Sequence, residues 1–274
     1  MTIARVLIIA GSDSGGGAGI QADIKTVTMF GGHAMTAITA ITAQNTLGVQ
    51  AVHPVPTDIV VAQMRACIDD LGVDAVKIGM IGSAATAHAV ADLLASLCSR
   101  EGGSPDWAPA FAGAQVSIPI VFDPVMIATS GSVLADADTI AAFARLMRLA
   151  TVTTPNLPEL AALGGEDAVR AHGCALLVKG GHADAASVQD RLIADDGETI
   201  WTHPRIDTAH THGTGCTLAS GIACGLAQGL SLVEATGRAI AYVQAALAAA
   251  PGIGTGHGPM GHALGQIPYD RCRD

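Results

Sequence analysis

Hydrophobic runs of strand length alternate with segments of helical spacing along most of the chain. Continuous apolar runs that predict buried strands lie at residues 5–10, 75–78, 118–122, 151–154 and 175–179. β-branched runs that predict further strands lie at residues 36–42 and 50–55. Residues 189–194 and 198–203 predict a hairpin around Asp196 and Gly197. Apolar residues with helical spacing predict helices over residues 18–30, 58–71, 84–97, 136–149, 215–228 and 232–249.

This alternation predicts an α/β protein whose central sheet is mostly parallel and is covered by helices on both faces. No linker and no internal repeat divides the sequence, so we expect one domain over residues 1–274. Residues 101–115 are rich in Gly, Ser, Pro, Asp and Ala and predict a surface loop inserted between a helix and a strand.

Composition narrows the classes of partner. Half of the 274 residues are hydrophobic and only 14% are charged, which is typical of a large aliphatic core. The formal net charge of -10 argues against nucleic acid or an anionic membrane as a partner. No run is long enough to span a bilayer, and the N-terminus does not resemble a signal peptide. The six cysteines form no CxxC pair, so we expect reduced thiols in a cytoplasmic protein.

Each predicted parallel strand ends in a polar or glycine-containing element. In open α/β sheets, ligands bind at the carboxyl ends of the strands. Elements that we expect to converge at this edge are Gly11-Ser12-Asp13, Gly79-Met80, Asp123-Pro124-Val125, Pro155-Asn156 and Gly180-Gly181-His182.

The glycine-rich stretch at residues 11–19 fits neither a dinucleotide fingerprint nor a P-loop. The fingerprint needs a glycine where Ile20 stands, and no Gly-Lys-Ser/Thr follows. The stretch is either a tight turn with close helix packing or a place where the backbone approaches a ligand. Asp23 and Lys25, one turn later, favour the ligand interpretation.

Oxygen donors and a lysine mark the neighbouring strand ends. Asp123 could simply form a turn, and Asn156 with Glu159 could be a helix cap of the capping-box type. Together the three residues also suit a hydrated Mg²⁺ that bridges nucleotide phosphates. Lys179 at the end of a buried strand needs an anionic partner, which a nucleotide phosphate would supply.

Residues 212–217 read His-Gly-Thr-Gly-Cys-Thr and are followed by a small, apolar helix. A glycine-rich turn that opens a helix presents unpaired backbone N–H groups and positive dipole charge, so an anion is the expected guest. A thiol in this first turn tends to have a lowered pKa, although Cys216 could also be a buried space-filler. The histidines nearby form no HExxH motif and no Cys/His quartet, which argues against a structural zinc site.

Several of these stretches resemble one known family when they are taken in order along the chain. The matching stretches are 10–26, Thr39-Ala40-Ile41-Thr42-Ala43-Gln44-Asn45-Thr46, Val76-Lys77-Ile78-Gly79-Met80, Asp123-Pro124-Val125-Met126, Thr154-Pro155-Asn156-Leu157-Pro158-Glu159, 178–182, 211–217 and Gly256-His257-Gly258-Pro259. The set resembles the hydroxymethylpyrimidine/phosphomethylpyrimidine kinases of thiamine biosynthesis, within the ribokinase-like superfamily. The resemblance implies a one-domain, three-layer α/β/α sandwich, usually dimeric, that uses ATP and Mg²⁺ to phosphorylate hydroxymethylpyrimidine and then its monophosphate.

The resemblance also implies roles for individual residues. Gln44 matches the glutamine that reads the pyrimidine and its amino group, as an amide with donor and acceptor can. The implied substrate-pocket residues also include Gly11, Asp23 and Met80. Asp123, Asn156 and Glu159 match the region that arranges Mg²⁺, and Lys179 matches a residue near the nucleotide phosphates. The implied anion hole consists of Gly213, Thr214, Gly215 and Cys216, with Cys216 where most sugar kinases have an aspartate base.

Two departures and three alternatives stay open at this point. The loop at 101–115 is longer than the family pattern, and the segment at 163–174 is shorter, which puts in doubt a nucleotide contact there. A pyridoxal/pyridoxine kinase on the same scaffold is the nearest alternative function. An NAD-dependent oxidoreductase is a further alternative. It is disfavoured because this chain lacks the third glycine of the fingerprint and the acidic residue expected near the end of the next strand. A non-catalytic nucleotide-binding protein fits poorly with Asp123, Asn156, Glu159, Lys179 and Cys216 all present.

Overall fold

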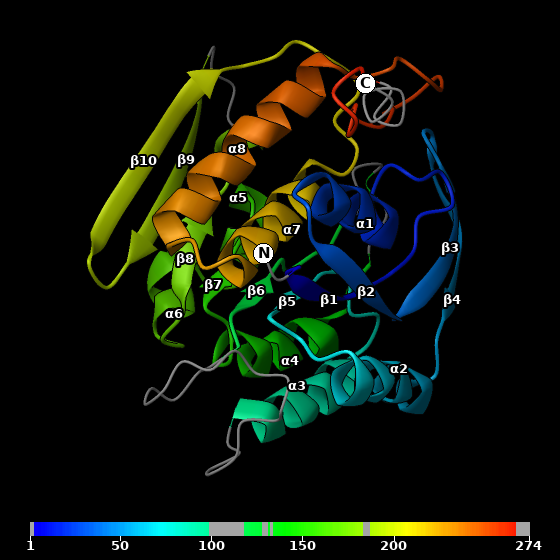
Figure 1. Ribbon diagram of the computed structural model, residues 1–274, viewed down its shortest axis with the longest axis vertical. Coiled ribbons are helices and arrows are strands. Elements are labelled where there is room, and N and C mark those ends of the chain that lie inside the picture. The colour runs from blue at the N-terminus through cyan, green and yellow to red at the C-terminus, as the bar shows by residue number, and fades with distance from the viewer. Residues whose placement is uncertain (1–2, 99–117, 128–130, 132–133, 183–186, 267–274) are drawn as a thin grey trace.

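The computed structural model describes residues 3–98, 118–127, 131, 134–182 and 187–266 (Figure 1). Its main feature is an eight-stranded sheet in the order β10-β9-β8-β7-β6-β5-β1-β2. The parallel strands are β1 Arg5–Ala10, β2 His33–Ile38, β5 Ala75–Ile78, β6 Ile120–Phe122, β7 Val152–Thr153 and β8 Ala175–Val178. The hairpin of β9 Ser187–Ala194 and β10 Gly197–Pro204 extends one edge of the sheet in antiparallel pairing.

Helices cover both faces of this sheet, which confirms the α/β/α sandwich (Figure 1). One face packs on α1 Gly19–Met29, α7 Thr214–Ala227 and α8 Leu232–Ala248. The other face packs on α2 Thr57–Asp70, α3 Ala84–Cys98, α4 Ala137–Met147, α5 Leu157–Ala162 and α6 Glu166–Arg170. The strand side chains alternate between the two cores: Leu7 and Ile9 belong to one, and Val6 and Ile8 to the other.

The small residues of α7 have a packing role. The helix lies between α1 and α8 (Figure 1). A Cβ atom added at Gly221 would lie 2.9 Å from the Cβ of Ala239, and one added at Gly225 would lie 2.7 Å from that of Ala235. Larger side chains would push α8 away from α7. The Ala/Gly composition therefore holds the two helices in close contact.

The expected strand at residues 36–42 is wrong, because the chain leaves the central sheet at Thr39. β2 ends at Ile38, and β3 Ala40–Asn45 pairs instead with β4 Gly48–Pro54 in a separate two-stranded sheet. The N–H of Thr39 donates to the carbonyl of Ala10, and its hydroxyl donates to the carbonyl of Met80 at 2.6 Å. These contacts fix the point where the chain turns away from the sheet.

The other predicted elements appear within a few residues of their expected bounds. Sequence reasoning missed α6, whose five residues are too few to show a helical period. The expected loop at 101–115 lies outside the described residues. No helix among the described residues is long and apolar enough to cross a membrane.

Candidate active site

A cavity of about 630 Å³ lies at the carboxyl edge of the sheet. Its walls contain residues from the ends of β1, β5, β6, β7 and β8, from β3 and from the N-terminus of α7. The predicted site residues that line it are Gly11, Gln44, Met80, Asp123, Asn156, Glu159, Lys179, Gly213, Thr214, Gly215 and Cys216. The convergence expected at this edge is therefore confirmed.

The loop before α7 has the geometry expected of an anion site. Gly213 caps the helix with φ +88°, a left-handed conformation that favours glycine. A Cβ atom there would lie 1.9 Å from the carbonyl oxygen of Gly17, so the loop packs directly on the chain before α1. Within the described residues, no backbone carbonyl accepts from the N–H groups of Gly215 and Cys216. They are the unpaired donors that a helix N-terminus offers to an anion.

Cys216 lines the cavity in the first turn of α7 and is half-buried. The lowered pKa expected for this thiol is wrong. Burial raises the pKa of Cys216 to about 11, even though the Lys77 ammonium and an N–H from Gly19 act in the opposite direction. The carboxylates of Asp23 and Asp123 raise it further. Desolvation therefore outweighs the helix terminus, and the thiol is the main form at neutral pH.

Asp23 does not line the cavity, contrary to the expected substrate contact. Its side chain is fully buried and forms an ion pair with Lys77, with Nζ 2.9 Å from Oδ2. Ser220 of α7 donates to its Oδ1 at 2.7 Å. Burial raises the pKa of Asp23, although Lys77 and Ser220 lower it. Asp23 therefore joins α1, β5 and α7 beneath the cavity.

Lys77 is a site residue that sequence reasoning missed. It stands in β5, whose four residues are all buried, and its Nζ reaches both oxygens of Asp23. Burial lowers the pKa of Lys77, but Asp23, Cys216 and Asp123 outweigh this and raise it above its usual value. A lysine inside an otherwise apolar strand was the available signal.

Lys179 lies between the two carboxylates predicted to hold metal. Its Nζ is 2.7 Å from Oδ1 of Asp123 and 3.8 Å from Oε2 of Glu159. Thr154 also donates to Oδ1 of Asp123 at 3.1 Å. Burial lowers the pKa of Lys179, yet the two carboxylates raise it overall, so its ammonium stays charged. A cation therefore stands at the cavity wall beside Gly215, whose added Cβ would lie 3.2 Å from Nζ.

Asn156 and Glu159 form the capping box considered from the sequence. Asn156 Oδ1 accepts from the N–H of Glu159 at 2.8 Å, and Glu159 Oε2 accepts from the N–H of Asn156 at 2.8 Å. Burial raises the pKa of Glu159, and Asp123 adds to this while Lys179 opposes it. Both residues thus shape the start of α5 at the cavity wall.

The described residues contain no group of three or more His, Cys, Asp or Glu side chains able to hold a metal ion directly. Mg²⁺ is usually held by one or two carboxylates together with waters and substrate phosphates. Asp123 and Glu159 fit this mode, because they supply two carboxylates at one side of the cavity.

Gln44 reaches the cavity from the separate hairpin. The pairing of β3 with β4 shifts register between Ala43 and Gln44, and such a bulge redirects the side chain that follows. Ser14 holds the backbone of Gln44 in both directions: its hydroxyl accepts from the N–H and donates to the carbonyl, each at 2.7 Å. Gly11 and Met80 lie in contact on the floor nearby.

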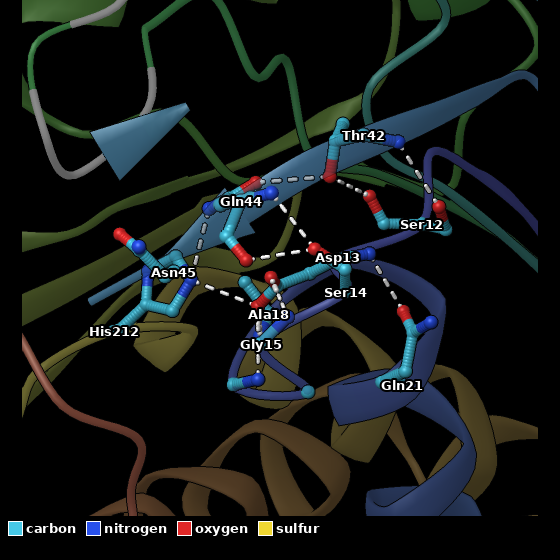
Figure 2. Close-up of polar contacts among 12 residues, drawn as sticks. Ser12, Asp13, Ser14, Gly15, Ala18, Gln21, Thr42, Gln44, Asn45 and His212 are labelled. Carbon is cyan, nitrogen blue, oxygen red and sulfur yellow. Dashed lines mark hydrogen bonds and ion pairs between the residues drawn. The ribbon is translucent and has the colours of Figure 1, made fainter. Parts of the chain in front are cut away.

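Asp13 organises the glycine-rich loop (Figure 2). Its Oδ1 accepts from the N–H of Gly15, and its Oδ2 accepts from the N–H groups of Gly17 and Ala18, each at 2.8 Å. His212 Nε2 lies 2.9 Å from the same Oδ2. The loop therefore wraps around a carboxylate of its own chain.

Lys25, which seemed to favour a ligand at this loop, has a structural contact instead. Its Nζ donates to the carbonyl of Gly16 at 2.7 Å. A Cβ atom at Gly19 would lie 2.4 Å from the carbonyl oxygen of Gly11, so close packing accounts for this glycine.

The phosphomethylpyrimidine kinase family model matches residues 13–101 and 110–261 of the chain. The hydroxymethylpyrimidine/phosphomethylpyrimidine kinase of Streptomyces coelicolor is 43% identical over 95% of this chain and 96% of its own. The enzyme of the same description from Rhizobium meliloti is 45% identical over 94% of this chain and 97% of its own.

Solved structures share the fold over nearly the whole chain. An ADP complex of Bacillus subtilis pyridoxal kinase is 30% identical with a TM-score of 0.81, covering 96% of this chain and 98% of that one. The phosphomethylpyrimidine kinase of Clostridium difficile is 33% identical with a TM-score of 0.70, covering 89% of this chain and 98% of that one. The likeness agrees with the ribokinase-like fold expected from the sequence.

Proposed function

Because this chain belongs to the phosphomethylpyrimidine kinase family and is a hydroxymethylpyrimidine/phosphomethylpyrimidine kinase of thiamine biosynthesis, we propose that both of its phosphoryl transfers take place in the cavity at the carboxyl edge. One observation carries this proposal. The unpaired N–H groups of Gly215 and Cys216, the Lys179 ammonium and the Gln44 amide all border one cavity.

In this proposal each part of the cavity has a separate task. Gln44 binds the aminopyrimidine edge and places the hydroxymethyl oxygen near the start of α7. The N–H groups of Gly215 and Cys216 and the ammonium of Lys179 bind the γ-phosphoryl group. A new P–O bond forms to the substrate oxygen while the bond to the β-phosphate breaks and ADP leaves. Fixed donors of this kind stabilise the charge on the transferring group.

Cys216 accepts the proton of the substrate hydroxyl in the first transfer. The thiol is mostly protonated at neutral pH, so the reactive thiolate is a minor form. In a loose transition state the proton leaves late, which makes a small thiolate fraction sufficient. The second transfer needs no such base, because the attacking oxygen belongs to a phosphate that is already ionised at neutral pH.

Asp123 and Glu159 would hold Mg²⁺ through its waters, with Asn156 supporting Glu159 through the capping box. When bound, Mg²⁺ neutralises charge on the nucleotide phosphates. The Lys179 ammonium lies within ion-pair distance of both carboxylates, offsets their mutual repulsion and stays charged. The family resemblance further supports a cytoplasmic homodimer.

A pyridoxal kinase activity in the same cavity is the second candidate. It is supported by the likeness to the Bacillus subtilis pyridoxal kinase, at 30% identity over nearly the full chain. The two activities are compared by incubating the purified protein with MgATP and either hydroxymethylpyrimidine or pyridoxal, and following ADP formation. We expect the higher kcat/KM with hydroxymethylpyrimidine. Turnover of pyridoxal alone would overturn the proposal.

A further inference from the structure

Gln44, His212 and Asp13 form a connected side-chain network at the substrate end of the cavity (Figure 2). They come from β3, from the loop before α7 and from the loop after β1, and Asp13 and His212 are 199 residues apart in sequence. His212 Nε2 lies 2.9 Å from Asp13 Oδ2 and 3.0 Å from Gln44 Nε2. One ring nitrogen therefore meets both the carboxylate and the amide.

The carboxylate decides the protonation of that nitrogen. Asp13 is 2% exposed. Burial alone would raise the pKa of Asp13, but hydrogen bonds from His212 and from the N–H groups of Ala18 and Gly15 outweigh burial and hold the pKa below its usual value. Asp13 is therefore an anion that can only accept hydrogen bonds. The contact at 2.9 Å requires a proton on Nε2 of His212.

The donor state of His212 in turn fixes the amide of Gln44. An N–H group on His212 attracts an oxygen and repels an amide N–H₂ group. A half-turn of the Gln44 amide exchanges its two ends without changing its shape. The protonated Nε2 therefore selects the orientation in which Gln44 Oε1 shares the Nε2 proton with Asp13 as a second acceptor.

Thr42 favours the same orientation from the other end of the amide. Its hydroxyl lies 2.8 Å from the carbonyl oxygen of Ser12, which takes its single proton. The Gln44 amide end 3.4 Å from this hydroxyl consequently meets a lone pair and not a proton. A lone pair at this position favours the amide nitrogen of Gln44 over its oxygen. Thr42 and His212 therefore favour the same orientation of the Gln44 amide, with Nε2 toward Thr42 and Oε1 toward His212.

We propose that Asp13 and His212 are positioning residues that orient the Gln44 amide, and so determine selectivity for an aminopyrimidine. In this orientation, Oε1 keeps a second lone pair for the amino group of the substrate, and Nε2 can donate to the adjacent ring nitrogen. Pyridoxal has no amino group beside a ring nitrogen and cannot make this pair of bonds. The inference rests on the proposed function, in which Gln44 reads the pyrimidine.

Steady-state kinetics of His212→Ala, Gln44→Ala and the double variant test the proposal. We expect His212→Ala to raise KM for hydroxymethylpyrimidine by about tenfold, which corresponds to the loss of one hydrogen bond to the substrate. KM for ATP should change by less than about twofold. In the Gln44→Ala background, the same change should alter KM for hydroxymethylpyrimidine by less than about twofold, because the two residues act together. A tenfold loss in both backgrounds, or none in either, would overturn the positioning role.

Three further measurements separate this role from a purely structural one. His212→Gln restores a donor near the position of Nε2 and should recover most of the affinity, while His210→Ala removes a nearby histidine that does not line the cavity and should leave KM unchanged. The ratio of kcat/KM for hydroxymethylpyrimidine to that for pyridoxal should fall in His212→Ala. If Gln44→Ala itself leaves KM for hydroxymethylpyrimidine unchanged, the proposed reading by Gln44 fails. If Gln44→Ala raises KM for hydroxymethylpyrimidine but His212→Ala does not, only the positioning role fails.

Discussion

At the scale of single residues, the chemistry depends on which groups the fold removes from water. Cys216 stands at a helix N-terminus, a position that usually favours a thiolate, yet burial raises its pKa to about 11. The charges that shift this pKa most are two carboxylates, which raise it, and the ammonium of Lys77, which lowers it and is already paired with Asp23. The environment of the thiol, and not its place on the helix, therefore sets its protonation.

Cys216→Ala should separate the two phosphoryl transfers. The first transfer must remove a hydroxyl proton, so we expect its rate to fall by about 100-fold, whereas the second should fall by less than about tenfold. Rapid-quench measurement of each step, starting from hydroxymethylpyrimidine or from its monophosphate, provides the comparison. Equal losses in the two steps would contradict a role as base.

The pH dependence of the first transfer gives a second measure of the same residue. An acid with a raised pKa supplies more base as the pH rises toward that value. The logarithm of kcat/KM for hydroxymethylpyrimidine should therefore increase between about pH 7 and 10, because the pKa of Cys216 is about 11. This increase should be lost in Cys216→Ala. If kcat/KM of the variant rises with pH as it does in the wild type, the pH dependence belongs to another group.

At the scale of elements, the site depends on contact between the loop before α7 and the loop before α1. The chain at Gly213 comes so close to Gly17 that no side chain fits between them. The same contact places His212 beside Asp13 and the N-terminus of α7 beside Lys179. A change at this crossing should therefore disturb both stability and substrate binding.

Gly213→Ala tests this crossing, with Gly229→Ala as its matched control. Both glycines have a positive φ, of +88° and +85°, but a Cβ atom at Gly229 would meet nothing within 4 Å. We expect Gly229→Ala to lower the free energy of unfolding by about 1 kcal/mol, from backbone strain alone, and Gly213→Ala to lower it by about 3 kcal/mol or more. Denaturant unfolding of both variants measures the difference. Equal losses would show that the clash is relieved at no cost.

Sequence patterns predicted the elements well wherever the chain is regular. Continuous apolar strands and the convergence of their carboxyl ends located Asp123, Asn156 and Lys179 correctly. The split at Thr39 was missed because β-branched residues continue across it and only long-range contacts mark the turn. The burial of Asp23 in α1 was missed because its partner Lys77 lies on strand β5, 54 residues away. Pairings between distant residues leave no local pattern.

At the scale of the whole molecule, buried polar groups tie the C-terminal segment to the core. His262 is buried, its Nε2 lies 3.0 Å from the hydroxyl of Thr217 in α7, and its carbonyl accepts from Tyr242 of α8 at 2.7 Å. Burial and the charge of Lys25 lower the pKa of His262 to about 4. The folded protein therefore holds this imidazole neutral.

A neutral buried histidine makes stability depend on pH. The unfolded chain binds the proton near pH 6.5 and the folded chain only near pH 4, so stability is fully present above pH 6.5 and falls as the pH drops through this window. The contribution is up to about 3 kcal/mol. Chemical unfolding of wild type and His262→Gln at several pH values should show a smaller loss in the variant. Parallel pH curves would contradict this assignment.

The central claim is that one cavity carries out both phosphoryl transfers, with Lys179 binding the γ-phosphoryl group of the ATP consumed in each. The most direct test follows the monophosphate and the diphosphate in time, with MgATP and hydroxymethylpyrimidine, in wild type, Lys179→Ala and the exposed control Arg148→Met at the C-cap of α4. The account predicts that both rates fall together by about 100-fold or more in Lys179→Ala and stay unchanged in Arg148→Met. Formation of either product at the wild-type rate in Lys179→Ala would contradict it.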